Sequence, residues 1–244
     1  MSVKHLSRTL GLALVAVLAV GAVMASAALA AANPVWHVNG GTTFTEEAYN
    51  ATQKSESEAG VKELVATVSG VKVTIVCKKY TGTGKIIKAS SGNIATGTFE
   101  GCKANVNGCK LKNGSITVEP STATLVWEKS SGSEALLKLV PNNAEKKFAE
   151  FEFIECNFGL GNGKYKVKGE ALGEVRPVAT EVTTGELIFP GAVITKYWEG
   201  EPRSEHTVTT ALQVENAGGA KGNVETFHET ENVSLVSGNK FGAF

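Results

Sequence analysis

Every acidic side chain of this 244-residue chain is a glutamate, so its acid–base chemistry depends on Glu alone. The absence of Asp excludes an Asp-based triad, an aspartic-protease dyad, an EF-hand loop and the Asp ligands of nucleotide-bound magnesium. Glycoside hydrolysis is the main acid–base reaction that Glu can run here. It needs two carboxyl groups about 5.5 Å or about 6.5–9.5 Å apart, with one of them in an apolar setting. The candidates flanked by an aromatic ring are Glu128 beside Trp127 and Glu199 beside Trp198.

Strand geometry weakens this catalytic interpretation, because neighbouring residues of a strand point to opposite faces. If Trp127 points inward, Glu128 points outward, and the pattern favours carboxylates on a solvated strand face. Aromatic residues of a β domain either pack in the core or form an exposed binding platform. The candidate binding aromatics are Trp36, Trp127, Tyr197 and Trp198. A glycan or a cell-surface polymer is the ligand class that such a platform admits.

The remaining motifs do not have the spacing that their chemistry requires. Gly82-Thr83-Gly84-Lys85 lacks both the first Gly and the final Ser or Thr of a phosphate-binding loop, and it predicts a Gly-rich hairpin turn. No serine lies in a G-x-S-x-G elbow. The mature histidines, His37, His206 and His228, have no partner at metal-ligand spacing. We therefore expect no metal, no cofactor and no catalytic residue.

The four cysteines indicate two disulfides, since an even number in an exported chain fits an oxidising compartment. They are Cys77, Cys102, Cys109 and Cys156. A turn-forming hexapeptide separates Cys102 from Cys109, and Cys77 and Cys156 each end an apolar strand. These features favour the pairs Cys102–Cys109 and Cys77–Cys156. A zinc site is disfavoured, because the chain has no C-x2-C pair.

Residues 1–30 have the pattern of a secretory signal peptide. Lys4 and Arg8 precede an apolar run that is too short to span a membrane, and Ala28-Leu29-Ala30 is the favoured cleavage site. The prediction is a secreted, extracellular protein with a single all-β domain at 31–244, a weak sub-boundary near 178–185 and no integral membrane segment in the mature chain. Removal of Lys4 and Arg8 leaves 22 basic against 24 acidic residues, a charge of −2. This balance implies no nucleic-acid partner.

Short alternating runs between turn signals predict an antiparallel β-sandwich or barrel-like domain with a dozen or so short strands and little helix. Phe151 and Phe153 alternate with Glu150 and Glu152, for example. A helical turn is predicted at 45–49, where Thr45 precedes two glutamates. The expected strands are 62–69, 71–79, 92–101, 115–119, 122–129, 134–140, 147–156, 164–169, 186–189, 192–198, 207–215, 223–228 and 233–236.

Several segments resemble those of a group of uncharacterised, secreted, β-rich, disulfide-containing proteins of soil actinobacteria. The segments are Trp36-His37-Val38-Asn39-Gly40, the four cysteines, Val167-Lys168-Gly169 and Leu172-Gly173-Glu174-Val175-Arg176-Pro177. The resemblance covers most of the mature chain. It implies export, a bacterial source and β structure, and it implies no activity or ligand.

The function predicted from the sequence is a secreted, non-catalytic binding or structural protein whose ligand and partners are unknown. An extracellular carbohydrate-active enzyme that uses Glu as acid and base is the alternative. A second alternative, an outer-membrane β-barrel, is disfavoured by the short strands and by the lack of ten-residue alternations between aromatic girdles.

Overall fold

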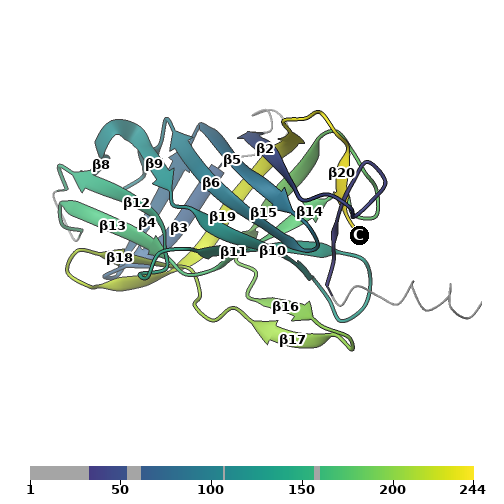
Figure 1. Ribbon diagram of the computed structural model, residues 1–244. Helices are drawn as coiled ribbons and strands as arrows, with labels where there is room; N and C mark the ends of the chain where they lie inside the picture. Colours follow the sequence, from purple (N-terminus) through teal and green to yellow (C-terminus); the bar gives the residue numbers. More distant parts are fainter. Residues whose placement is uncertain (1–32, 54–61, 107, 157–159) are drawn as a thin grey trace, which may run out of the picture. The chain divides into compact units, whose positions relative to one another are not determined.

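The computed structural model describes residues 33–53, 62–106, 108–156 and 160–244 (Figure 1). The predicted signal peptide and most of the polar segment 51–60 lie outside these ranges. Residues 32–244 form one compact unit. The fold is all-β, as the sequence predicts, and the described residues contain one short 3-10 turn, Lys112–Gly114. No helix in this described part has the length and apolarity needed to cross a membrane.

The described residues form twenty strands, more than the dozen expected. They are β1 (Trp36–Val38), β2 (Glu46–Gln53), β3 (Lys62–Val68), β4 (Val71–Cys77), β5 (Lys79–Ile87), β6 (Ser91–Glu100), β7 (Lys103–Ala104), β8 (Lys110–Leu111), β9 (Ser115–Val118), β10 (Ser121–Trp127), β11 (Ala135–Pro141), β12 (Lys147–Ile154), β13 (Gly163–Lys168), β14 (Ala171–Arg176), β15 (Gly185–Ala192), β16 (Lys196–Glu199), β17 (Ser204–Thr207), β18 (Gln213–Asn216), β19 (Lys221–Leu235) and β20 (Phe241–Ala243).

Most of these strands are segments of longer composite strands. We group two consecutive segments when both pair with the same neighbouring strand or composite strand. Strands β2 and β3 both pair with β19, and β4 and β5 continue one another beside them. In the same way β6 continues into β7, β9 into β10, β11 into β12 and β13 into β14. Strands β15 and β18 both pair with β19, with the β16–β17 hairpin inserted between them.

The composite strands close into a ring. In chain order they are β2/β3, β4/β5, β6/β7, β9/β10, β11/β12, β13/β14, β15/β18 and β19, and each pairs antiparallel with the next. The last, β19, pairs back with the first, for example Leu235 with Tyr49. An up-and-down order with this closure is an antiparallel barrel whose inner face is the core.

Alternation places the core as predicted. Along β12, Phe151 and Phe153 are buried while Glu150 and Glu152 are partly exposed. On the neighbouring β13, Tyr165 stacks on Phe151 with ring centroids 5.7 Å apart. Outside, Lys164 of β13 forms an ion pair with Glu150 at 2.8 Å.

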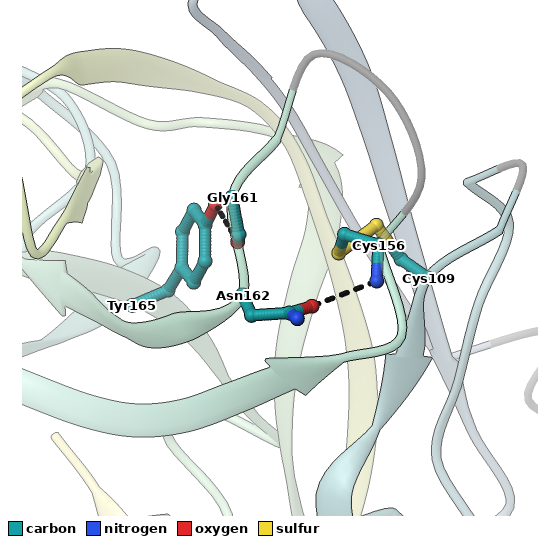
Figure 2. The surroundings of a disulfide bond; sticks show 5 residues. All are labelled: Cys109, Cys156, Gly161, Asn162 and Tyr165. Atoms are coloured by element: carbon teal, nitrogen blue, oxygen red, sulfur yellow. Dashed lines mark hydrogen bonds between the residues drawn. A yellow bond between two sulfur atoms is a disulfide. The ribbon is translucent and has the colours of Figure 1, made fainter.

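The two disulfides join all four cysteines, but the predicted pairing is wrong. Cys77 is bonded to Cys102, and Cys109 to Cys156. The hexapeptide between Cys102 and Cys109 does not close a small loop, because its first two residues form β7 and pair with β4, whereas β8, which follows Cys109, pairs with β12. Each disulfide therefore joins two strands that are already neighbours. Near Cys156, its backbone N–H donates to Asn162 Oδ1 at 2.7 Å and the Tyr165 hydroxyl donates to the Gly161 carbonyl at 2.9 Å (Figure 2).

Two local predictions also fail because barrel pairing outweighs local preference. Residues 46–49 belong to β2 and not to a helical turn, since they pair with β5. Gly82 and Gly84 lie within β5 and form no hairpin turn. The real turn of this hairpin is at 88–90, between Ile87 and Ser91.

One end of the barrel is covered by the two ends of the described chain. Strand β1 pairs with β20, Trp36 opposite Ala243 (Figure 1). The segment 178–182, within the predicted sub-boundary, joins this cover: Val178 bridges to Ala243 and Val182 to Phe241. The large side chains of this cover, those of Trp36 and Phe241, are buried and point toward the interior.

Candidate functional site

Strand β19 carries two glutamates into the barrel interior. Glu229 is 1 % exposed and Glu231 is 5 % exposed. Because side chains alternate along a strand, residues two apart share a face. Glu229 and Glu231 lie opposite the buried Phe189 and Leu187 of β15, which confirms that they face inward. Their Cα atoms are separated by roughly 7 Å, the rise of two strand residues.

Glu229 has a counter-charge. The Lys62 Nζ atom of β3 lies 2.9 Å from Glu229 Oε1, and both side chains are buried. The pair makes an ion contact but not a hydrogen bond of acceptable geometry, and neither group has another hydrogen-bond partner among the described residues. Burial raises the pKa of Glu229 to about 7, against the lowering effect of Lys62.

Glu231 has no such partner. Within the described part of the chain, the one buried ammonium group that acts on its carboxyl group, that of Lys62, is paired with Glu229. Burial raises its pKa well above the ordinary value, the charge of Glu229 raises it further, and Lys62 lowers it. A buried carboxyl group without a partner is costly when ionised, so it remains neutral until a cation or donor reaches it.

Two tyrosines lie beside Glu231. Burial raises the pKa of both Tyr49 and Tyr80, and the negative charge of Glu231 raises it further. The Tyr49 hydroxyl donates to the Asn93 carbonyl at 2.9 Å. Both phenols therefore stay protonated and neutral across the physiological pH range.

Glycines of the barrel wall make room for these rings. A Cβ atom at Gly84 would lie 2.5 Å from the Tyr49 hydroxyl, and one at Gly97 would lie 2.7 Å from that of Tyr80. Gly82 is similarly obstructed by the Tyr80 hydroxyl. The two glycines of Gly82-Thr83-Gly84 thus leave room for the rings of Tyr80 and Tyr49 to pack against the barrel wall.

Two cavities divide the interior. The first, about 50 Å³, is lined by Lys62, Cys77, Phe99, Phe151 and Glu229, and we call its surroundings the stapled half. The second, about 40 Å³, is lined by Trp36, Tyr49, Tyr80, Glu231 and Phe241, and we call its surroundings the covered half. Each has room for only a few water-sized groups.

The cover contributes a second unsatisfied polar group to the covered half. Trp36 is 4 % exposed, and its indole Nε1–H has no acceptor among the described residues. Its ring centroid lies 6.4 Å from that of Phe241. A buried donor without an acceptor and a buried carboxyl group therefore line the same cavity.

The four predicted binding aromatics do not form one platform. Trp36 lines the covered cavity, whereas Trp127 lies under the Arg203 guanidinium, 3.6 Å from the ring centroid. Trp198 is the cross-strand partner of Trp127 and is half-buried. Tyr197 is buried beneath the inserted hairpin, where its hydroxyl accepts a hydrogen bond from Lys138 Nζ at 2.6 Å. That any of them binds a ligand stays a prediction.

The glutamates singled out in the sequence lie elsewhere than the buried pair. Glu128 is partly exposed and contacts Lys129 at 3.5 Å, and Glu199 is also partly exposed. Sequence reasoning missed Glu229 and Glu231, because Glu229-Thr230-Glu231 separated two predicted strands. The signal was the period of two from Phe227 through Glu229, Glu231 and Val233 to Leu235.

The histidines stand apart from the interior carboxyl groups. His37 stacks on Phe244 with ring centroids 4.1 Å apart, and His206 stacks on Tyr197 at 5.4 Å. Across the described ranges, no group of three or more potential metal ligands comes together.

No protein-family model, curated protein or solved structure matches this chain. The functional argument therefore depends on the interior of the barrel.

Proposed function

We propose that the chain is an exported, non-catalytic binding protein that holds a small ligand inside the covered half of its barrel. One observation carries this proposal: the buried Trp36 indole N–H has no hydrogen-bond acceptor among the described residues, and it lines the same cavity as the buried Glu231, which has no printed ion-pair partner in that part of the chain. Buried polar groups in proteins are nearly always satisfied, and exceptions point to a bound molecule or water. The predicted signal peptide and the two disulfides support an extracellular location.

The competing enzyme function also has an observation in its favour. Two buried Glu side chains lie on one face of β19 with Cα atoms roughly 7 Å apart by strand geometry, a spacing compatible with the carboxyl separations of about 5–9.5 Å that glycosidases use. Neither cavity is large enough for a sugar ring, since ligand pockets usually measure about 300–1,000 Å³. This difference in size favours the binding function.

The test is a fragment screen on the isotopically labelled mature chain, residues 31–244, followed by protein-observed NMR. The fragments are cations, anions and neutral molecules of three to six heavy atoms. We expect at least one to shift the Trp36 indole N–H signal saturably. Hits that shift only surface residues, or no hits at all, would contradict the proposal.

A parallel hydrolysis assay on a panel of glycans separates the enzyme from the binding protein. Hydrolysis that is lost in both Glu229→Gln and Glu231→Gln, but kept in the matched Glu225→Gln variant, would replace binding with glycosidase activity. Glu225 is the suitable control because it lies on β19 but is exposed, where it accepts a hydrogen bond from Thr67.

A further inference from the structure

Among the described residues, the barrel interior holds more carboxyl groups than ammonium groups. Two carboxyl groups, Glu229 and Glu231, face one ammonium group, Lys62, and the lysine is already 2.9 Å from Glu229. Other cations at the rim of the covered cavity are also engaged. Lys85 pairs with Glu46 at 2.7 Å, and Arg176 pairs with Glu174 at 2.6 Å.

The walls of the covered cavity are unusually aromatic. Trp36, Tyr49, Tyr80 and Phe241 come from four strands, β1, β2, β5 and β20, and all line the same space. The faces of aromatic rings carry negative electrostatic potential and attract cations, most strongly where water is excluded. A carboxyl group without a counter-charge and a set of aromatic rings favour the same kind of ligand.

The size of the cavity limits that ligand. A volume of about 40 Å³ corresponds to about three or four water-sized groups. The free Trp36 N–H adds a donor for one oxygen atom of the ligand. A short ammonium compound with a hydroxyl group meets all of these conditions.

We propose that the covered cavity binds a small organic monocation of the ammonium type, with the Glu231 carboxylate as its counter-charge and Trp36, Tyr49 and Tyr80 around it. This inference depends on the proposed function, because it names the ligand class of that same site. It predicts selectivity by charge as well as by size.

Proton release provides a test that needs no variant. The groups that face Glu231 are Tyr49 of β2, Tyr80 of β5, Lys62 of β3 and Glu229 of β19 itself. Because burial raises the pKa of Glu231 well above its ordinary value, a cation that binds beside the carboxylate must displace the proton at any pH below that raised pKa. Calorimetric titration in buffers of different ionisation enthalpy measures that release.

The experiment titrates the labelled mature chain with methylammonium and 2-hydroxyethylammonium chloride. Acetate and acetamide serve as anionic and neutral probes of similar size. We expect both cations to shift the Trp36 indole N–H and the Glu231 amide, with release of a proton, and the other two probes to have no effect there. Glu231→Gln should weaken cation binding at least about tenfold, while the exposed Glu225→Gln should leave it unchanged.

The outcomes separate this inference from the proposed function. Binding of acetate or acetamide at Trp36, without binding of either cation, overturns the cation inference and leaves an interior binding site. Cation affinity that is unchanged in a folded Glu231→Gln variant, or binding without proton release, also overturns it. If none of the four probes nor any screened fragment reaches the interior, both proposals fail.

Discussion

The stapled half and the covered half of the barrel interior are built from the same alternating strands, yet they handle buried charge differently. In the stapled half, Glu229 is paired with Lys62, and the disulfide of Cys77 lies beside the same cavity. In the covered half, the Trp36 indole N–H has no hydrogen-bond acceptor and Glu231 has no ion-pair partner among the described residues, and the cover there consists of short strands with no disulfide. The stapled half therefore has the features of a core, and the covered half those of a site.

The largest expected effect comes from breaking the charge pair of the stapled half. Lys62→Met leaves the Glu229 carboxylate buried without a counter-charge, which costs about 3–5 kcal/mol of the free energy of unfolding at pH 8. The cost should shrink at pH 5, where Glu229 is protonated. Urea denaturation at both pH values measures it. A Lys62→Met, Glu229→Leu double variant is the control and should recover most of the loss; equal losses in single and double variants would contradict the pairing argument.

Removal of the disulfides comes next. The Cys109–Cys156 bond spans 47 residues of sequence and the Cys77–Cys102 bond spans 25. Chain entropy then predicts losses of about 4 and about 3.5 kcal/mol for the corresponding double Cys→Ser variants. Calorimetric melting of the purified variants checks both values. Non-reducing peptide mapping that recovered a Cys102–Cys109 peptide would refute the pairing itself.

The pH dependence of stability tests the buried carboxyl groups of both halves together. The pKa of Glu229 is about 7 in the folded chain and 4.5 as the ordinary value, so its contribution is complete below about pH 4.5 and is lost as pH rises through 7. We expect the free energy of unfolding to fall by about 2–3 kcal/mol between pH 5 and pH 8 from Glu229 alone. Glu231 adds a loss of the same sign.

The free energies of unfolding of the Glu229→Gln and Glu231→Gln variants, measured by denaturation, should each fall less steeply with pH over this range. Glu150 has the opposite behaviour, because Lys164 lowers its pKa, and its contribution is lost only below about pH 4.5. Stability that rises from pH 5 to pH 8 would contradict the burial of both carboxyl groups.

The smallest expected effect concerns the glycines behind the tyrosines. Gly84→Ala places a Cβ atom against both the Asn93 backbone carbonyl oxygen and the Tyr49 hydroxyl and should cost about 1–3 kcal/mol through overpacking. Gly161→Ala is the matched control, since nothing lies within 4 Å of its added Cβ atom. Thermal melting of the two variants gives the comparison; equal melting temperatures would mean that the ring does not need the glycine.

The sequence predicted the class of fold because alternation is a local signal. Runs such as 147–156 show their inner and outer faces directly, and the structure confirms them. The order of closure and the disulfide partners were not predictable, because they depend on which distant strands are neighbours. Cys77 lies near Cys102 only because β4 pairs with β7.

The candidate site was hidden for a related reason. Glu229 and Glu231 are polar residues at inward positions of a strand, and polarity alone marks such a segment as a loop. In the sequence alone, Gly82 and Gly84 similarly favour a turn. Only the structure shows that the rings of Tyr80 and Tyr49 pack against them. Of the predicted site residues, Trp36 alone lines the cavity that the proposal uses.

The pairing of β1 with β20 has a consequence for how the chain acquires its structure. The first described strand must meet the last, and β2 must meet β19, so neither contact can form until almost all of the described chain has been synthesised. Contacts between distant parts of a sequence slow folding, because the loop between them must close first. A chain of this topology therefore completes its structure only after the residues of β19 and β20 have been synthesised.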